Sequence, residues 1–269
     1  MKAPKENTVV LPYAKERAEF TLMSDTFMST YFRNIACAQV LLNDILDRDD
    51  LRVTYAGTQE VFPNLNGKKA QLDILALDDN NTIYNVEIQC KAKGASPLRA
   101  RYYSSIIDTN FLKSGMQHEQ LPKTVVIFIT EADTIGYGLP IYHIERIIKE
   151  KNISFGDKAE IIYVDAKNRS DTRLGRLMHD MHCKNACEMK NPILAQNMRY
   201  WKETEEGQQK MCEIMEELVK KENAKAMYNH TLELAKKLLR RGRYSYAEIA
   251  EDTGLPIETV LELAKQQSA

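Results

Sequence analysis

The chain has 269 residues, long enough for one large domain with appendages or for two modest domains. Hydrophobic residues make up 43% and charged residues 28%, an ordinary globular balance with ample material for a core. The formal net charge is −1, which excludes a bulk-charge attraction to nucleic acid or to an acidic membrane, so any such attraction must be local.

Three features of the sequence favour a soluble cytoplasmic protein with no membrane partner. The N-terminal stretch MKAPKENTVV lacks the apolar segment of a signal peptide. No run of about 18 apolar residues is present to span a membrane. The cysteines are odd in number and lack the spacing of a disulfide framework, which suits reduced thiols: Cys37, Cys90, Cys183, Cys187 and Cys212.

The first half of the chain predicts helices and then a β-hairpin. Residues 21–46 carry apolar side chains at helical spacing, and residues 52–62 are rich in β-prone types. Two apolar runs follow, at 72–77 and 82–89, and they flank the turn-forming cluster of residues 78–81. We therefore expect one or two amphipathic helices, a strand and a hairpin.

Helices and strands alternate in the middle of the chain. Pro97 fits the first turn of a helix that runs to about residue 112. The run TVVIFIT, residues 124–130, predicts a central strand that is buried on both faces. Residues 140–151 look helical, and residues 160–164 predict one more strand. This alternation predicts an α/β or α+β core that ends near residue 165.

The last third of the chain predicts helices alone. Residues 172–190 and 205–240 lack strand-like alternation and are rich in Leu, Met, Glu and Lys. Near the C-terminus, Ser245 and Glu248 have capping-box spacing. A break at Thr253-Gly254-Leu255-Pro256 then precedes a second short helix, which gives a helix–turn–helix outline.

The predicted organisation has four parts. They are a polar lead-in at 1–20, a mixed core at 21–170, a helical extension at 171–243 and a helix–turn–helix-like unit at 244–269.

Carboxylates interrupt the predicted hairpin LDILALDDNNTIYNVEIQCKAK, residues 72–93. Side chains alternate across a strand, so Glu87, Gln89 and Lys91 share one face. If the hairpin register brings Asp73 beside Glu87, the two like charges repel unless a cation is present. Mg²⁺ meets this need because it takes carboxylate oxygens, waters and phosphate as ligands. From the pattern alone, a solvated sheet face is the other interpretation.

The hairpin resembles that of the PD-(D/E)XK nucleases, and the longer likeness is to the PD-(D/E)XK nuclease family transposases, or Rpn recombination-promoting nucleases. The Asp, followed by about a dozen residues and then Glu-x-Lys, appears here as Asp73 and Glu87-Ile88-Gln89, with Gln in place of lysine. The similar segments cover residues 20–266 and include SDTFMSTYFRNI, LDI…NVEIQ, RARYYSSI, GLPIYHIERII, HDMHCKNACEM and IAEDTGLPIETV.

The resemblance implies a restriction-endonuclease-like α/β core, a mixed sheet flanked by helices, followed by an all-helical C-terminal region. It also implies a DNA endonuclease with Mg²⁺ held by Asp73 and Glu87, and with Gln89 positioning water or phosphate. Lysine supplies a positive charge that Gln lacks. We expect Lys91 or Arg101 to supply that charge instead.

Phosphate contacts are expected from basic and aromatic side chains near the hairpin and near the C-terminus. Arg99 and Arg101 are two residues apart, so on a helix at most one of them faces the site. Arg101 with Tyr102 or Tyr103 fits a phosphate contact. The segment KKLLRRGR, residues 236–243, is either a DNA-binding patch or a solvated helix end. Its candidates for DNA contact are Lys236, Arg240 and Arg241.

Two further motifs have less specific interpretations. The segment HDMHCKNAC looks like a zinc site, but His182 and Cys183 are adjacent and diverge on a helix, whereas His179 and Cys183 lie one turn apart on the same side. Helix surface and core account for these residues. The terminal residues 244–269 are acidic, so we expect this helix pair to pack on the body or on a partner rather than to read DNA.

Two functions from different classes therefore remain. One is a Mg²⁺-dependent DNA endonuclease that promotes recombination or acts in mobile-element or defence biology. The alternative is an inactive protein of nuclease fold that binds DNA or a protein partner. Because double-strand cutting usually needs two sites, a homodimer remains an open option.

Overall fold

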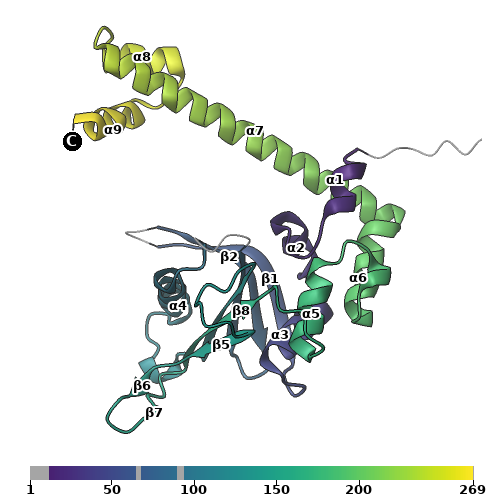
Figure 1. Cartoon of the computed structure of the whole chain (residues 1–269). Helices are drawn as coiled ribbons and strands as arrows, with labels where there is room; N and C mark the ends of the chain where they lie inside the picture. The colour runs from purple at the N-terminus through teal and green to yellow at the C-terminus, as the bar shows by residue number, and fades with distance from the viewer. Residues whose placement is uncertain (1–11, 65–67, 90–93, 269) are drawn as a thin grey trace, which may run out of the picture. The chain divides into compact units, whose positions relative to one another are not determined.

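The computed structural model describes residues 12–64, 68–89 and 94–268, which fall into two compact units (Figure 1). The larger unit is Ala14–Gly207, and the smaller unit is made, among the described residues, of 12–13 and 208–268. All strands of the described residues belong to the larger unit.

A six-stranded mixed sheet forms the centre of the larger unit, in the order β1-β2-β3-β4-β8-β5. The first three strands are antiparallel neighbours, β4 and β8 run parallel to β3, and β5 is antiparallel to β8. The prediction of a mixed sheet flanked by helices is confirmed. The strands are β1 (Val53–Phe62), β2 (Ala70–Asp78), β3 (Ile83–Gln89), β4 (Thr124–Thr130), β5 (Ile141–Ile144) and β8 (Ala159–Asp165).

Local sequence explains the two elements that place the carboxylates. Every residue of β4 is buried, as expected for a β-branched run in the middle of a sheet. The hairpin of β2 and β3 turns at Asp78, whose Oδ1 accepts hydrogen bonds from the backbone N–H groups of Asn80 and Thr82 at 2.9 and 2.8 Å. Asn81 has a φ of 58°, a conformation that Asn tolerates. The predicted hairpin and central strand are confirmed.

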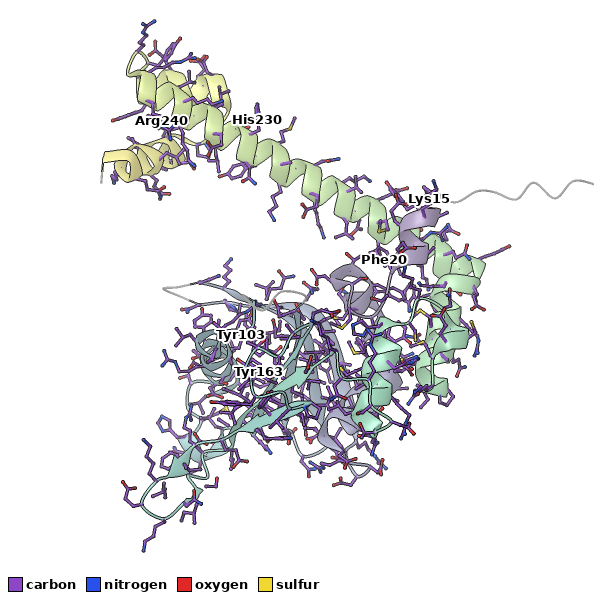
Figure 2. All side chains as sticks on the ribbon, in the orientation of Figure 1. Lys15, Phe20, Tyr103, Tyr163, His230 and Arg240 are labelled. Carbon is purple, nitrogen blue, oxygen red and sulfur yellow. The ribbon has the colours of Figure 1, made fainter. Side chains whose placement is uncertain are left out.

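Helices cover both faces of the sheet (Figure 1). Helix α4 (Pro97–Phe111) lies on one side, and α3 (Ile35–Leu46) and α5 (Arg173–His182) lie on the other. Under α4, the rings of Tyr103 and Tyr163, labelled in Figure 2, each stack on Phe128, with centroids 6.3 and 5.4 Å away. This aromatic stack fixes the side of α4 that faces the sheet.

Helix α2 (Asp25–Tyr31) packs against β1 and β2. Thr58 of β1 connects them, because its hydroxyl donates to the backbone carbonyl of Ser29 and accepts from Arg33 Nε at 2.8 Å. The first residue of α2, Asp25, is therefore held close to β1. The remaining short elements of the unit are α1 (Ala14–Glu19), η2 (His118–Gln120), η3 (Ala186–Glu188) and α6 (Pro192–Glu203).

The prediction of a helix over residues 140–151 is wrong. This segment forms β5 and the strand β6 (Ile147–Ile148), which pairs with β7 (Ile153–Ser154) in a separate two-stranded sheet. Its apolar residues recur every three to four positions, as in a helix, but pairing decides the structure. Tyr142 pairs with Tyr163 of β8, and Asn152 has a φ of 53° in the turn between β6 and β7.

The smaller unit is helical, with α8 (Tyr246–Thr253) and α9 (Ile257–Ser268) following α7 (Glu205–Arg241), which begins within the larger unit. The predicted capping box of Ser245 and Glu248 is present, and Gly254 ends α8 with a φ of 69°. The helices share a small apolar core that includes Ala235, Ile249 and Val260. Helix α7 is 37 residues long, yet neither it nor any other helix in the described ranges is long and apolar enough to cross a membrane.

Candidate active site

Asp73 and Glu87 lie where the backbone pairing of β2 and β3 stops. The last paired residues are Ile74 and Val86. One row further, Glu87 Oε1 accepts a hydrogen bond from the backbone N–H of Asp73 at 3.2 Å. In turn, Asp73 Oδ2 accepts from the backbone N–H of Ile88 at 3.1 Å. Each carboxylate therefore takes a backbone N–H of the neighbouring strand, which holds the two acids side by side.

Arg99 of α4 joins this pair through its guanidinium group. Its Nη2 lies 3.0 Å from Glu87 Oε2, and its Nη1 donates to Gln89 Oε1 at 3.2 Å. The hydroxyl of Tyr103 accepts from Nε at 2.9 Å and from Nη2 at 2.6 Å, and the carbonyl of Gly94 accepts from Nη1 at 2.8 Å. Because the Glu87 side chain has no exposed surface, Arg99 is the cation that offsets its charge.

The two acids are held in an environment that opposes their ionisation. Burial raises the pKa of Asp73 and of Glu87, and the charge of Asp73 raises the pKa of Glu87 further. The charge of Arg99 acts in the opposite direction on both carboxyls. Paired carboxylate oxygens in a partly buried site are the donors that a hard divalent cation prefers. The residues present therefore fit Mg²⁺, which would offset the repulsion between the two acids.

A cleft with a volume of about 790 Å³ opens beside Asp73 and Gln89. Glu87 lies beneath its surface, with no exposed area of its own. The charged side chains that line the cleft are Asp25, Asp73, Lys68, Lys69 and Arg99.

The structure places Arg99, not Arg101, at the carboxylates. Of the two arginines, Arg99 lines the cleft and contacts Glu87, and the role of Arg101 in the reaction stays a prediction. Arg101 is exposed and does not line the cleft. Tyr103 is largely buried but lines the cleft, and its hydroxyl accepts hydrogen bonds from Arg99. The helix fixes this choice, because the face that carries Tyr103 onto Phe128 also carries Arg99. Lys91 lies outside the described residues.

The basic residues predicted near the C-terminus belong to the smaller unit. Lys236 of α7 is half-buried and pairs with Glu233 at 2.7 Å. Arg240, labelled in Figure 2, and Arg241 are exposed at the end of the same helix. Their role in DNA contact stays a prediction.

A family model described as PD-(D/E)XK nuclease family transposase matches residues 33–238, which is more than half of the chain. The chain belongs to this family. Membership supports a nuclease or mobile-element role and implies a DNA substrate. PD-(D/E)XK nucleases generally use divalent metal ions, in agreement with the oxygen donors of Asp73 and Glu87. No curated protein and no solved structure matches the chain.

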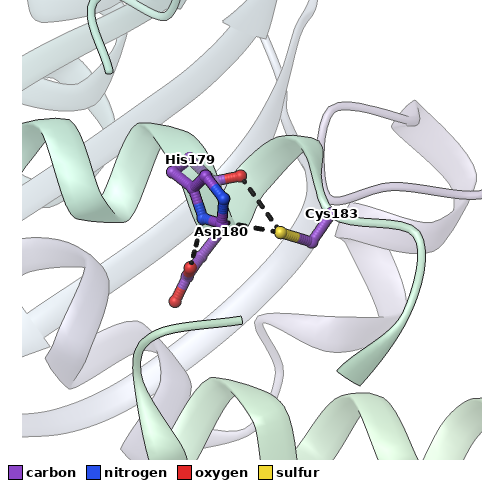
Figure 3. A group of neighbouring side chains, drawn as sticks. All are labelled: His179, Asp180 and Cys183. Atoms are coloured by element: carbon purple, nitrogen blue, oxygen red, sulfur yellow. Dashed lines mark hydrogen bonds and ion pairs between the residues drawn. The ribbon is translucent and has the colours of Figure 1, made fainter. Parts of the chain in front are cut away.

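This PD-(D/E)XK chain also gathers His179, Asp180 and Cys183 at the end of α5 (Figure 3). His179 Nδ1 lies 3.0 Å from Asp180 Oδ1 and 3.6 Å from Cys183 Sγ. Asp180 is fully buried and accepts from the backbone N–H groups of Lys190 and Asn191 at 2.8 and 2.7 Å. The carboxylate therefore ties α5 to the start of α6, in agreement with the interpretation as helix surface and core.

The raised carboxyl pKa values predict how the stability of the metal-free protein depends on pH. A carboxyl whose pKa is higher in the folded state than in the unfolded state binds more protons when folded, so stability falls as pH rises. For Asp73 and Glu87 we expect the free energy of unfolding to decline from about pH 4 to about pH 8. Urea denaturation at several pH values with EDTA checks this, and a rise in stability over that interval would contradict it.

Among the cleft residues that were not predicted from the sequence, four carry polar or charged groups close to the acids or to the cleft mouth: Asp25, Gln59, Lys68 and Lys69. Two of them carried a weak signal, because the adjacent lysines come just before the carboxylate hairpin. Asp25 lies in the family-like segment SDTFMSTYFRNI but was not singled out, and Gln59 carried no signal, since both reach the site only through the packing of α2 and β1 against β2.

Proposed function

We propose that the chain is a Mg²⁺-dependent DNA endonuclease that hydrolyses phosphodiester bonds and promotes recombination, or acts in mobile-element or defence biology, in the cytoplasm. One observation carries the proposal: Asp73 and Glu87 lie side by side at a cleft, each bonded to the strand of the other. Family membership supplies the reaction class.

The side chains of the site have different proposed roles. Asp73 and Glu87 would hold the cation, which would supply positive charge near the scissile phosphate and lower the pKa of a bound water. Gln89 lies with its Nε2 3.5 Å from Asp73 Oδ2, so its carboxamide orients groups that approach this oxygen. Arg99 bonds to Gln89 Oε1 and thereby brings to this position the positive charge that glutamine lacks.

Lys68 and Lys69 are proposed as contacts for the DNA backbone. Both are exposed at the cleft, and each phosphate contact adds about 0.9 to the slope of log affinity against log salt. We expect the double substitution Lys68→Ala/Lys69→Ala to weaken DNA binding and to reduce this slope by about 2. Fluorescence anisotropy over a salt series, without divalent metal, measures it.

The matched control removes two exposed lysines elsewhere in the larger unit, as Lys149→Ala/Lys151→Ala. We expect its slope to stay that of the wild type. Equal losses in the two double variants would show a response to net charge alone and would contradict contacts at the cleft.

Cleavage of supercoiled plasmid tests the proposed reaction. We expect nicked and then linear DNA with Mg²⁺, and none with EDTA. DNA binding without cleavage by the wild type would favour the second candidate, an inactive nuclease fold that binds DNA. Two observations favour that candidate: glutamine replaces the lysine of the motif, and Arg99 pairs with Glu87. A homodimer would link the two strand cuts, which sedimentation of the active protein would detect.

A further inference from the structure

Gln59 has an unusual backbone conformation for a residue in the middle of a strand. Its neighbours pair normally with β2, as Thr58 with Ile74 and Glu60 with Leu72, which places Gln59 opposite Asp73. Yet Gln59 has a φ of 56°, in the left-handed region that side chains other than Gly, Asn and Asp seldom adopt. Such strain persists only where the surroundings impose it, and it gathers at functional sites.

Contacts of the preceding residue and of the Gln59 side chain hold this backbone conformation. The preceding residue, Thr58, is buried and bonded to both Ser29 and Arg33. The side chain of Gln59 is aimed into the cleft, whose wall it forms together with Asp73. The conformation therefore turns an amide toward the candidate aspartate.

The orientation of this amide follows from its contacts. Gln71 Nε2 donates to Gln59 Oε1, so the oxygen of Gln59 faces Gln71 and its nitrogen faces the acids. Gln59 Nε2 lies 3.4 Å from Asp73 Oδ1 and 3.4 Å from Asp25 Oδ1. The two N–H groups of one amide thus face two carboxylates, one from β2 and one from α2.

We propose that Gln59 is a positioning residue for Asp73: it holds Oδ1 in place and bridges Asp73 to Asp25. Asp73 Oδ2 is held by the backbone N–H of Ile88, so Gln59 completes the fixing of the carboxylate. Without the amide, the like charges of Asp25 and Asp73 lose the donor that bridges them. This inference rests on the proposed function in one respect, namely that Asp73 holds the divalent cation.

The variant Gln59→Gly distinguishes a positioning role from a purely structural one, because the first predicts a loss of metal affinity and the second predicts a change in stability alone. Glycine adopts positive φ without steric cost, so Gln59→Gly relieves the backbone and is expected to keep or raise the melting temperature. It also removes the amide, and loss of a residue that orients a metal ligand typically weakens metal affinity 10–100-fold. We expect Mn²⁺ affinity, measured by calorimetry, to fall about 10-fold.

Lys158 provides the matched control, because it is exposed and has a φ of 59°. Lys158→Gly is expected to keep or raise the melting temperature in the same way and to leave Mn²⁺ affinity unchanged. Gln59→Asn tolerates the left-handed conformation and keeps an amide, so it is expected to bind Mn²⁺ better than Gln59→Gly. Wild-type affinity in Gln59→Gly would overturn the proposal.

A double-mutant cycle tests the Gln59–Asp73 contact without metal. Urea midpoints are compared for wild type, Gln59→Leu, Asp73→Asn and the double variant, all in EDTA. Coupled residues give non-additive midpoints, which is the expected result, and additive midpoints would overturn the proposal. If the wild type binds no Mn²⁺ but the cycle is non-additive, the positioning contact stands and the metal-dependent function fails.

Discussion

Replacing Asp73 with asparagine is expected to remove Mg²⁺-dependent cleavage while leaving the protein folded. In the proposed site, the Asp73 carboxylate is the metal ligand that lines the cleft. A bound metal contributes several kcal/mol to the transition state, and about 4 kcal/mol corresponds to about 10³-fold in rate. The same change removes a charge that burial disfavours, since burial raises the pKa of Asp73. We therefore expect the metal-free variant to be more stable than the wild type near pH 8.

Asp108→Asn is the matched control for this substitution. Asp108 is a half-buried carboxyl of α4 whose pKa burial also raises, and it accepts a hydrogen bond from Thr124 rather than facing the cleft. We expect its plasmid cleavage rate to stay near that of the wild type. Retention of cleavage by Asp73→Asn, with this control also active, would remove Asp73 from the reaction.

Replacing Arg99 with methionine is expected to destabilise the metal-free protein by about 1 kcal/mol near pH 9, one unit above the raised pKa of about 8 of Glu87, because the ionised carboxylate loses its cation and takes up a proton instead. Glu87 is fully enclosed, and the substitution leaves its charge without the partner that lies 3.0 Å away. The loss is expected to shrink near pH 5, because burial raises the pKa of Glu87 and a protonated Glu87 needs no cation. Urea denaturation at the two pH values measures both effects.

Arg101→Met is the control for Arg99→Met, because it removes the same group two residues along α4 from an exposed position. Exposed substitutions of this kind usually change stability by no more than about 0.5 kcal/mol. If Mg²⁺ occupies the site, it should restore part of the stability that Arg99→Met loses. Equal losses in the two variants would show that Arg99 does not neutralise Glu87.

The hairpin that carries the carboxylates and the strand beside it were predictable because their signals are local. An Asp/Asn cluster between two apolar runs specifies the turn of the hairpin, and Asp78 and Asn81 supply it. A run of β-branched residues interrupted by Phe128 alone specifies the buried strand β4. The register that brings Asp73 beside Glu87 was left open by the sequence, and the pairing of Ile74 with Val86 in the structure sets it.

The remaining parts of the site depend on packing, which residue spacing does not encode. Both arginines fit a helix beside the site, and the stacking of Tyr103 on Phe128 decides that Arg99 faces it. Gln59 has a positive φ that contacts of β1 with α2 impose. Glutamine has no intrinsic preference for that conformation, so the sequence gives no sign of it. The helix predicted over residues 140–151 is wrong for the same reason, because strand pairing overrides the helix-like spacing of its apolar residues.

The most direct measurement is anomalous diffraction from crystals of the full chain soaked in Mn²⁺, used in place of Mg²⁺. The account predicts an anomalous peak within ligand distance of both Asp73 and Glu87, which is absent in Asp73→Asn. A peak at His179 and Cys183 with none at Asp73, or a peak at Asp73 that survives the substitution, would contradict it.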